Sequence, residues 1–172
     1  MHSVKQSDSA SRFVRLLTGF DGNVTNLLEQ IVGAPIQVVD VRQHDIPLPA
    51  KSVLYDHGNR TALRRDAVLM SQTGLRLATA RSHLALARLP PEVQGALRCG
   101  TQPIGRILTR HRLEVFREVV RCRLLAPTPG DADPPSHSDD DPVVERVSQV
   151  WRDERPVMEI TELFTRICLG LL

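Results

Sequence analysis

The sequence predicts an α+β protein in which an antiparallel sheet is covered by helices. Segments rich in β-branched residues come in consecutive pairs joined by short turns, which is typical of antiparallel hairpins. Helical patterns gather at the start and in the middle of the chain instead of alternating with the strands. The chain has 172 residues, of which 41% are hydrophobic. We therefore expect one domain that spans residues 1–172.

The first elements are two helices and a strand. An amphipathic pattern predicts a short helix over residues 12–17, and Asp21 is a candidate N-cap for a second helix over about residues 22–32. Gly33 is the expected C-terminal stop of that second helix. The β-branched run at residues 36–42 then predicts a strand, and a loop with two prolines follows it.

A hairpin comes next, with predicted strands at residues 62–71 and 75–81. With a symmetric three-residue turn between them, Arg65 lies opposite Arg81, and both side chains point toward the core. Two like charges in that position need an anion between them, and a carboxylate-bearing ligand would serve. The alternative is a bulge or a shifted register that places one arginine in water.

The middle of the chain predicts two short helices. Tandem prolines open the first, which runs to about Leu97 before Gly100 ends it. Residues 101–108 predict a tight turn that enters the second helix, with Pro103 in its first positions. The segment 113–125 fits a strand by its β-branched content and a helix by its spacing, so both remain open.

The last third predicts a loop and a second hairpin. Residues 127–142 hold five prolines and five aspartates, with almost no apolar residue. Such a segment cannot contribute to a core, so we expect a mobile loop that interrupts the domain without dividing it. The final hairpin pairs residues 144–151 with 156–164 through a charged turn.

Composition excludes several classes of function. The 22 basic and 20 acidic residues are interspersed and aromatic residues make up 3%, so a nucleic-acid surface is not indicated. No long apolar stretch or secretory leader is present, so we expect a cytoplasmic protein without a membrane segment. The three cysteines are far apart and no two histidines have i, i+4 spacing, so we predict no metal site.

A carboxylate falls on the apolar face of the last predicted strand. Met158, Ile160, Glu162 and Phe164 share one face because side chains alternate along a strand. Desolvation would raise the pKa of such a carboxyl unless a cation opposes the shift, and a carboxyl tuned in this way suits general acid chemistry. The equally good alternative is a structural ion pair between Glu162 and one of the two hairpin arginines.

The turn Pro103-Ile104-Gly105-Arg106 adds a candidate binding feature. Gly105 allows the backbone to approach a ligand closely, and free N–H groups at a helix start favour a carboxylate. Alternatively, Gly105 is a packing glycine and Arg106 a solvated surface residue.

These motifs together resemble the chorismate pyruvate-lyases, also called 4-hydroxybenzoate synthases. They occur in the family's order and approximate spacing, and the resemblance extends over residues 22–164. The matching segments are 63–69, Ala80-Arg81, 103–108 and Thr161-Glu162-Leu163-Phe164, while residues 21–29 resemble the start of a helix in actinobacterial-type members.

The resemblance implies a chorismate lyase-like fold and a cofactor-independent carbon-oxygen lyase. Family members convert chorismate to 4-hydroxybenzoate and pyruvate, in a cavity closed by helical flaps, and hold the aromatic product tightly. By this resemblance Arg65 binds the ring carboxylate and Glu162 contacts the para oxygen. Ile104 and Gly105 line the pocket, and Arg81 suits the enolpyruvyl carboxylate.

The implied chemistry agrees with the charged residues. Two arginines would neutralise and orient a dicarboxylate, and Glu162, if protonated, could donate a hydrogen bond to the departing oxygen. The chain departs from compact members in the insertion at residues 127–142. It also departs at Val24, where a larger apolar side chain often lines the pocket, so the substrate could be a relative of chorismate.

A second hypothesis is a non-catalytic domain that binds an aromatic carboxylate effector, because the fold is related to the ligand-binding half of a class of bacterial regulators. The chain has no basic recognition helix for DNA. A lyase for a chorismate relative in specialised metabolism is the third hypothesis. The sequence indicates neither an oligomeric state nor the pathway that the product serves.

Overall fold

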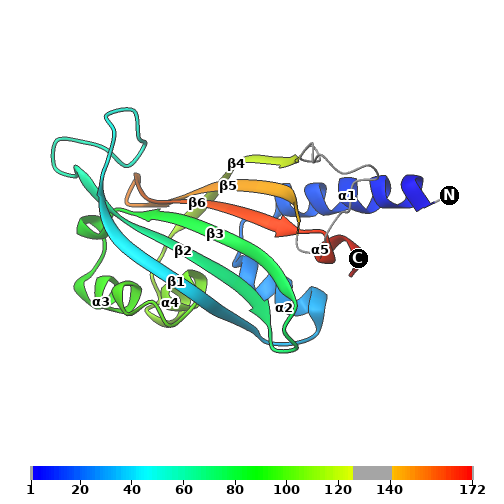
Figure 1. Ribbon diagram of the computed structural model, residues 1–172. Helices are drawn as coiled ribbons and strands as arrows, with labels where there is room; N and C mark the ends of the chain where they lie inside the picture. Colours follow the sequence, from blue (N-terminus) through cyan, green and yellow to red (C-terminus); the bar gives the residue numbers. More distant parts are fainter. Residues whose placement is uncertain (1, 126–140, 172) are drawn as a thin grey trace.

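A computed structural model describes residues 2–125 and 141–171 (Figure 1). It confirms the α+β class, with a six-stranded antiparallel sheet and helices. In chain order the elements are α1 (His2–Gly19), α2 (Val24–Val32), β1 (Ile36–Pro47), β2 (Thr61–Ser71), β3 (Arg76–Leu84), a 3₁₀ turn (Leu86–Arg88), α3 (Pro91–Cys99), α4 (Ile104–Arg110), β4 (Phe116–Leu124), β5 (Pro142–Arg152), β6 (Arg155–Thr165) and α5 (Ile167–Gly170).

The strands follow the order β1-β2-β3-β6-β5-β4 across the sheet. Two hairpin-linked groups therefore meet at the centre, where β3 pairs with β6. Helices α2, α3 and α4 lie together on one face of the sheet (Figure 1). This helix-covered face is the inner face of the sheet, and the opposite face is the outer one.

Local signals explain most element boundaries, with one correction. The N-cap of α2 is Asn23, whose side chain accepts a hydrogen bond from the Thr25 N–H at 3.0 Å; Asp21, the predicted cap, lies two residues too early. Gly33 and Gly100 end α2 and α3 in the left-handed conformation, with φ of 69° and 74°. Both glycine stops were predicted.

Two predicted elements are longer than expected, and the structure decides between strand and helix for a third segment. Helix α1 extends far beyond residues 12–17, and β1 continues to Pro47 instead of ending at residue 42. The ambiguous segment 113–125 forms strand β4. The predicted loop at residues 127–142 lies almost wholly outside the described residues, and its last residue, Pro142, begins β5.

A one-residue bulge changes the register of the β2–β3 hairpin. The turn closes as predicted, because the Ser71 N–H donates to the Leu75 carbonyl at 2.9 Å. Beyond the turn, however, Leu69 pairs with Ala78, so Leu77 is an extra residue on β3. Leu77 and Ala78 are consequently both fully buried, although neighbours in a regular strand point to opposite faces.

The bulge overturns the predicted pairing of the two arginines. Arg65 lies opposite Ser82, and Arg81 lies opposite Asp66. Because the side-chain period of a strand is two, the one-residue shift moves Arg81 to the outer face while Arg65 stays on the inner one. The predicted alternative, a bulge that puts one arginine in water, is therefore the correct one.

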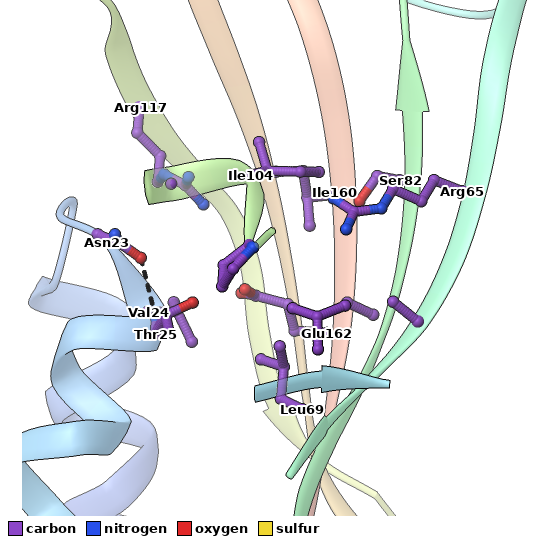
Figure 2. A pocket seen from close by; sticks show the side chains of 15 residues that line it. Asn23, Val24, Thr25, Arg65, Leu69, Ser82, Ile104, Arg117, Ile160 and Glu162 are labelled. Carbon is purple, nitrogen blue, oxygen red and sulfur yellow. Dashed lines mark hydrogen bonds between the residues drawn. The ribbon is translucent and has the colours of Figure 1, made fainter. Parts of the chain in front are cut away.

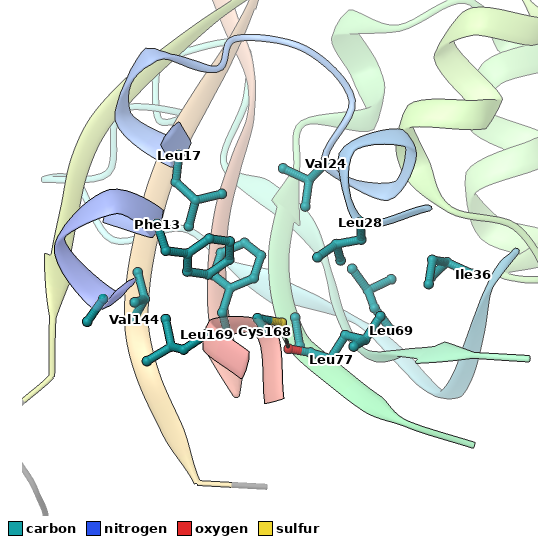
Figure 3. Close-up of a cluster of buried hydrophobic side chains, with 13 residues drawn as sticks. Phe13, Leu17, Val24, Leu28, Ile36, Leu69, Leu77, Val144, Cys168 and Leu169 are labelled. Atoms are coloured by element: carbon teal, nitrogen blue, oxygen red, sulfur yellow. Dashed lines mark hydrogen bonds between the residues drawn. The ribbon is translucent and has the colours of Figure 1, made fainter. Parts of the chain in front are cut away.

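The apolar core on the inner face has two parts. One part lies beneath α1, α2 and α5 and includes a perpendicular contact between the Phe13 and Phe164 rings, with centroids 5.4 Å apart (Figure 3). The C-terminal segment joins this part through Cys168, which is fully buried. The other part lies beneath α3 and α4 and includes Leu97 and Met158. Among the described residues, no helix is long and apolar enough to cross a membrane.

Candidate functional site

A band of small, polar and charged side chains crosses the inner face between the two parts of the core. Four adjacent strands each place apolar residues on both sides of this band. Its members are Arg65 and Ala67 on β2, Ser82 and Ala80 on β3, Ile160 and Glu162 on β6, and Ser148 and Arg146 on β5. Of these eight, only Ile160 is a large apolar side chain. Burying so many polar groups in mid-sheet is costly unless they are paired or used by a ligand.

A pocket opens over this band (Figure 2). It holds about 480 Å³ of space free of protein atoms, part of it open to solvent. The sheet forms its floor, while residues at the starts of α2 and α4 form its walls. The lining comprises Asn23, Val24, Thr25, Val38, Arg65, Ala67, Leu69, Ala80, Ser82, Pro103, Ile104, Gly105, Arg117, Ile160 and Glu162.

Arg65 is a buried cation without a carboxylate partner among the described residues. The residue is 2% exposed, and its Nη2 donates hydrogen bonds to the carbonyls of Gly100 and Gln102 at 3.1 and 2.8 Å. Nε is buried and has no hydrogen-bond partner in the described part of the chain. Burial lowers the pKa of the guanidinium. A buried charge with an unused donor can bind an anionic ligand.

Glu162 is buried on the inner face as predicted, but neither predicted partner is correct. Its ion pair is with Arg146, whose Nη1 donates to Oε2 at 2.9 Å. Arg146 is fully buried, and its Nε and Nη2 donate to the carbonyls of Leu17, in the last turn of α1, and of Phe20, just after α1. The ion pair therefore holds the Glu162 carboxylate at the pocket, while the two carbonyl hydrogen bonds of Arg146 tie the sheet to the end of α1.

Arg117 is a second cation in the pocket wall. It lies on the edge strand β4, and Nη1 donates to the Ser148 hydroxyl at 3.3 Å. Burial lowers the pKa of the Arg117 guanidinium; the charge of Glu162 opposes that shift and the charge of Arg146 reinforces it. No carboxylate within the described residues forms an ion pair with Arg117. Figure 2 shows Arg117 and Arg65 reaching toward the pocket from opposite sides.

The starts of α2 and α4 meet at Gly105. A Cβ at this position would overlap the Asn23 side-chain amide, so the two helix starts can approach this closely only with glycine. Gly105 is thus a packing glycine that also lines the pocket, and its close approach to a ligand stays a prediction. Arg106, considered as a solvated surface residue, forms an ion pair with Glu29 of α2 and links the same two helices.

The structure brings five of the six predicted site residues together. Arg65, Glu162, Ile104, Gly105 and Val24 all line the pocket.

Arg81 is the exception. Its side chain is 54% exposed on the outer face, where Nε pairs with Asp66 at 2.7 Å. Arg81 lines a separate hollow on the outer face together with Arg64 and Asp66. It therefore cannot face the pocket that holds Arg65.

Sequence reasoning missed Arg117 and Arg146. Arg117 falls in the segment for which strand and helix remained open, so it had no predicted face. For Arg146, a second bulge beside Trp151 shifts the β5–β6 register by one residue and so sets which face points inward. The alternation of Val144, Arg146, Ser148 and Val150 was the available signal.

Comparisons with known proteins agree with this architecture. No curated protein matches the sequence. Among solved structures, the effector domain of PhnF from Mycobacterium smegmatis is similar to the chain with a TM-score of 0.57 at 16% identity, covering 84% of this chain and 88% of that one. The longer structure of PhnF gives a TM-score of 0.54 at 18% identity, with 86% of this chain and 65% of that chain covered.

A third similar structure is the ligand-binding domain of a GntR-family transcriptional regulator from Bordetella bronchiseptica. Its TM-score is 0.50 at 14% identity, and the match covers 77% of this chain and 85% of that chain. At these identities the likenesses establish the fold alone. A family model described as "Chorismate pyruvate-lyase Rv2949c-like" matches residues 16–169. Since that match covers well over half of the chain, the chain belongs to the Rv2949c-like chorismate pyruvate-lyase family.

Proposed function

We propose that this protein is a chorismate pyruvate-lyase that converts chorismate to 4-hydroxybenzoate and pyruvate without a cofactor. The observation that carries the proposal is Arg65, a buried guanidinium with an unused donor at one side of a pocket in which Glu162 is the sole carboxylate among the described lining residues. This arrangement suits a ring that has a carboxylate at one end and a hydroxyl at the other. Membership of the family supports the same reaction.

In the proposed complex, Arg65 binds the ring carboxylate. Glu162 accepts a hydrogen bond from the ring hydroxyl, which survives as the phenol of the product. Arg146 keeps the carboxylate of Glu162 in place, because a buried charge needs a paired and hydrogen-bonded partner. Val24, Leu69 and the other apolar lining residues exclude water from the ring faces.

The reaction needs little chemistry from the protein. The bond between the ring carbon and the enolpyruvyl oxygen breaks, and the hydrogen on the adjacent hydroxyl-bearing carbon leaves as a proton. The electrons of that C–H bond complete the aromatic ring, while the released enolate takes up a proton at its methylene carbon to give pyruvate. Holding the side chain in a reactive geometry and stabilising its negative charge are the main tasks of the site.

The test is an incubation of purified protein with chorismate, with 4-hydroxybenzoate followed by chromatography and pyruvate by a coupled assay. We expect both products in equal amounts and faster than in a sample without protein. Isochorismate and aminodeoxychorismate in parallel reactions distinguish the related lyases. A rate equal to spontaneous breakdown for all three would refute a lyase function.

The second candidate function is a non-catalytic domain that binds an aromatic carboxylate. The observation in its favour is the structural similarity to the PhnF effector domain and to the GntR-family ligand-binding domain. The same pocket would then hold a ligand through Arg65 without converting it. Tight binding of 4-hydroxybenzoate by calorimetry, together with no turnover of the three candidate substrates, would support this function in place of the lyase.

A further inference from the structure

We propose that Arg117 is a second carboxylate anchor in the pocket, and that it makes the site selective for ligands with two carboxylates over ligands with one. This inference rests on the proposed function, because it assigns the ring carboxylate to Arg65. Arg117 takes the role that was predicted for Arg81, whose side chain is on the outer face because of the β3 bulge.

The charges around the pocket favour a dianion. Glu162 neutralises Arg146 through their ion pair, which leaves Arg65 and Arg117 as two positive charges without a carboxylate partner among the described residues. Removing guanidinium groups from water is costly, and a ligand with two negative charges would compensate both. A ligand with one carboxylate would leave one of the two cations unpaired.

The positions of the two arginines also suit separate carboxylates. Arg65 is on β2 and Arg117 on β4, and these strands are four strand spacings apart, which is roughly 19 Å between backbones. Both long side chains reach inward from these two strands (Figure 2). Ile104 and Glu162 line the same pocket as the two arginines.

Arg117 is held in place but retains donors for a ligand. Its one hydrogen bond within the described residues is from Nη1 to Ser148, a neutral hydroxyl at 3.3 Å, which orients the side chain without neutralising it. The other arginines of β4 have a different environment. Arg121 and Arg123 both pair with Glu145 at 2.9 and 2.8 Å, and their side chains are more than half exposed.

Two ligands that differ by one carboxylate test the proposal by titration calorimetry. The monocarboxylate is 3-methoxy-4-hydroxybenzoate, and the dicarboxylate is 3-(carboxymethoxy)-4-hydroxybenzoate, a stable compound with its second carboxylate on the ether. We expect Arg117→Gln to weaken binding of the dicarboxylate by about tenfold or more, as for other close charge pairs, and binding of the monocarboxylate less than about twofold. Arg117→Lys should restore part of the loss.

The matched control is Arg123→Gln, which removes the same charge from the same strand but on the outer face. It should leave both affinities unchanged. Equal weakening of both ligands by Arg117→Gln, or no weakening of either, would overturn the proposal. If the wild-type protein fails to cleave chorismate but shows the selective loss, the anchor stands and the lyase function fails. If chorismate is cleaved and Arg117→Gln binds both ligands as tightly as the wild type, the lyase function stands and the proposed role of Arg117 fails.

Discussion

Two buried arginines on the same face of the sheet should respond differently to replacement by methionine. Arg65 and Arg146 are 2% and 0% exposed. Arg146 neutralises a buried carboxylate and binds two carbonyls, whereas Arg65 binds two carbonyls and keeps one donor unused. If Arg65 is present for a ligand, its removal should cost the protein far less stability than removal of Arg146.

The structure gives the expected magnitudes. Arg146→Met leaves the Glu162 carboxylate buried without its partner, which typically costs about 3–5 kcal/mol. Arg65→Met loses two hydrogen bonds from a charged donor, each worth roughly 1.5–3 kcal/mol. The same change removes a guanidinium whose burial costs several kcal/mol, so the net loss of unfolding free energy should stay below about 2 kcal/mol.

Urea unfolding followed by far-UV circular dichroism measures both variants. With a slope of about 2 kcal/mol/M, Arg146→Met should lower the midpoint by roughly 1.5–2.5 M and Arg65→Met by less than about 1 M. Arg65→Met should nevertheless abolish turnover and binding of 4-hydroxybenzoate. The double variant Arg146→Met/Glu162→Met, which removes both charges, should recover much of the stability lost in the single variant. Equal destabilisation by the Arg65 and Arg146 changes would refute the argument, because Arg65 would then be a structural residue.

Two further predictions concern the pocket wall and the outer face. Gly105→Ala should lower kcat/KM at least about tenfold, because the added Cβ displaces the Asn23 amide and separates the starts of α2 and α4. Adding Asn23→Gly, which frees the space at little cost to the N-cap of α2, should restore most of the activity. No rescue by the second change would show that another contact is responsible. Burial raises the pKa of the Asp66 carboxyl, but hydrogen bonds from Arg64 and Arg81 lower it more, so the net shift is downward. The stabilising contribution of Asp66 should therefore be complete above about pH 4 and disappear as the pH falls through the lowered pKa. The free energies of unfolding of wild type and Asp66→Asn should differ by up to about 1 kcal/mol at pH 7 and converge below pH 4. A constant difference from pH 7 to pH 2.5 would contradict this assignment.

The residues that terminate elements and the apolar face of the last strand could be predicted from sequence because their causes are local. Gly33 and Gly100 stop helices through their own backbone freedom, and Met158, Ile160, Glu162 and Phe164 share a face through simple alternation. The position of Arg65 could be predicted in the same way. The family motifs then located the rest of the pocket lining that sequence reasoning named.

The errors at the site have a common cause. Each strand has a side-chain period of two, so a single extra residue reverses the face of everything beyond it. The bulge at Leu77 moved Arg81 to the outer face, and the bulge beside Trp151 helps to set the inward position of Arg146. No glycine or proline lies at the bulge at Leu77, and Pro156 is opposite Trp151 at the other bulge, where a proline is equally typical of the start of a strand.

The sequence alone determined the α+β class, the antiparallel hairpins and the inward positions of Arg65 and Glu162, because these follow from local periodicity and turn chemistry. Only the tertiary structure decided the partners of these charges. Arg146 reaches Glu162 and Arg117 reaches the pocket because β4, β5 and β6 pair in a register set by bulges and by packing against the helices. Charge pairing across a sheet depends on long-range register, which no short stretch of sequence specifies.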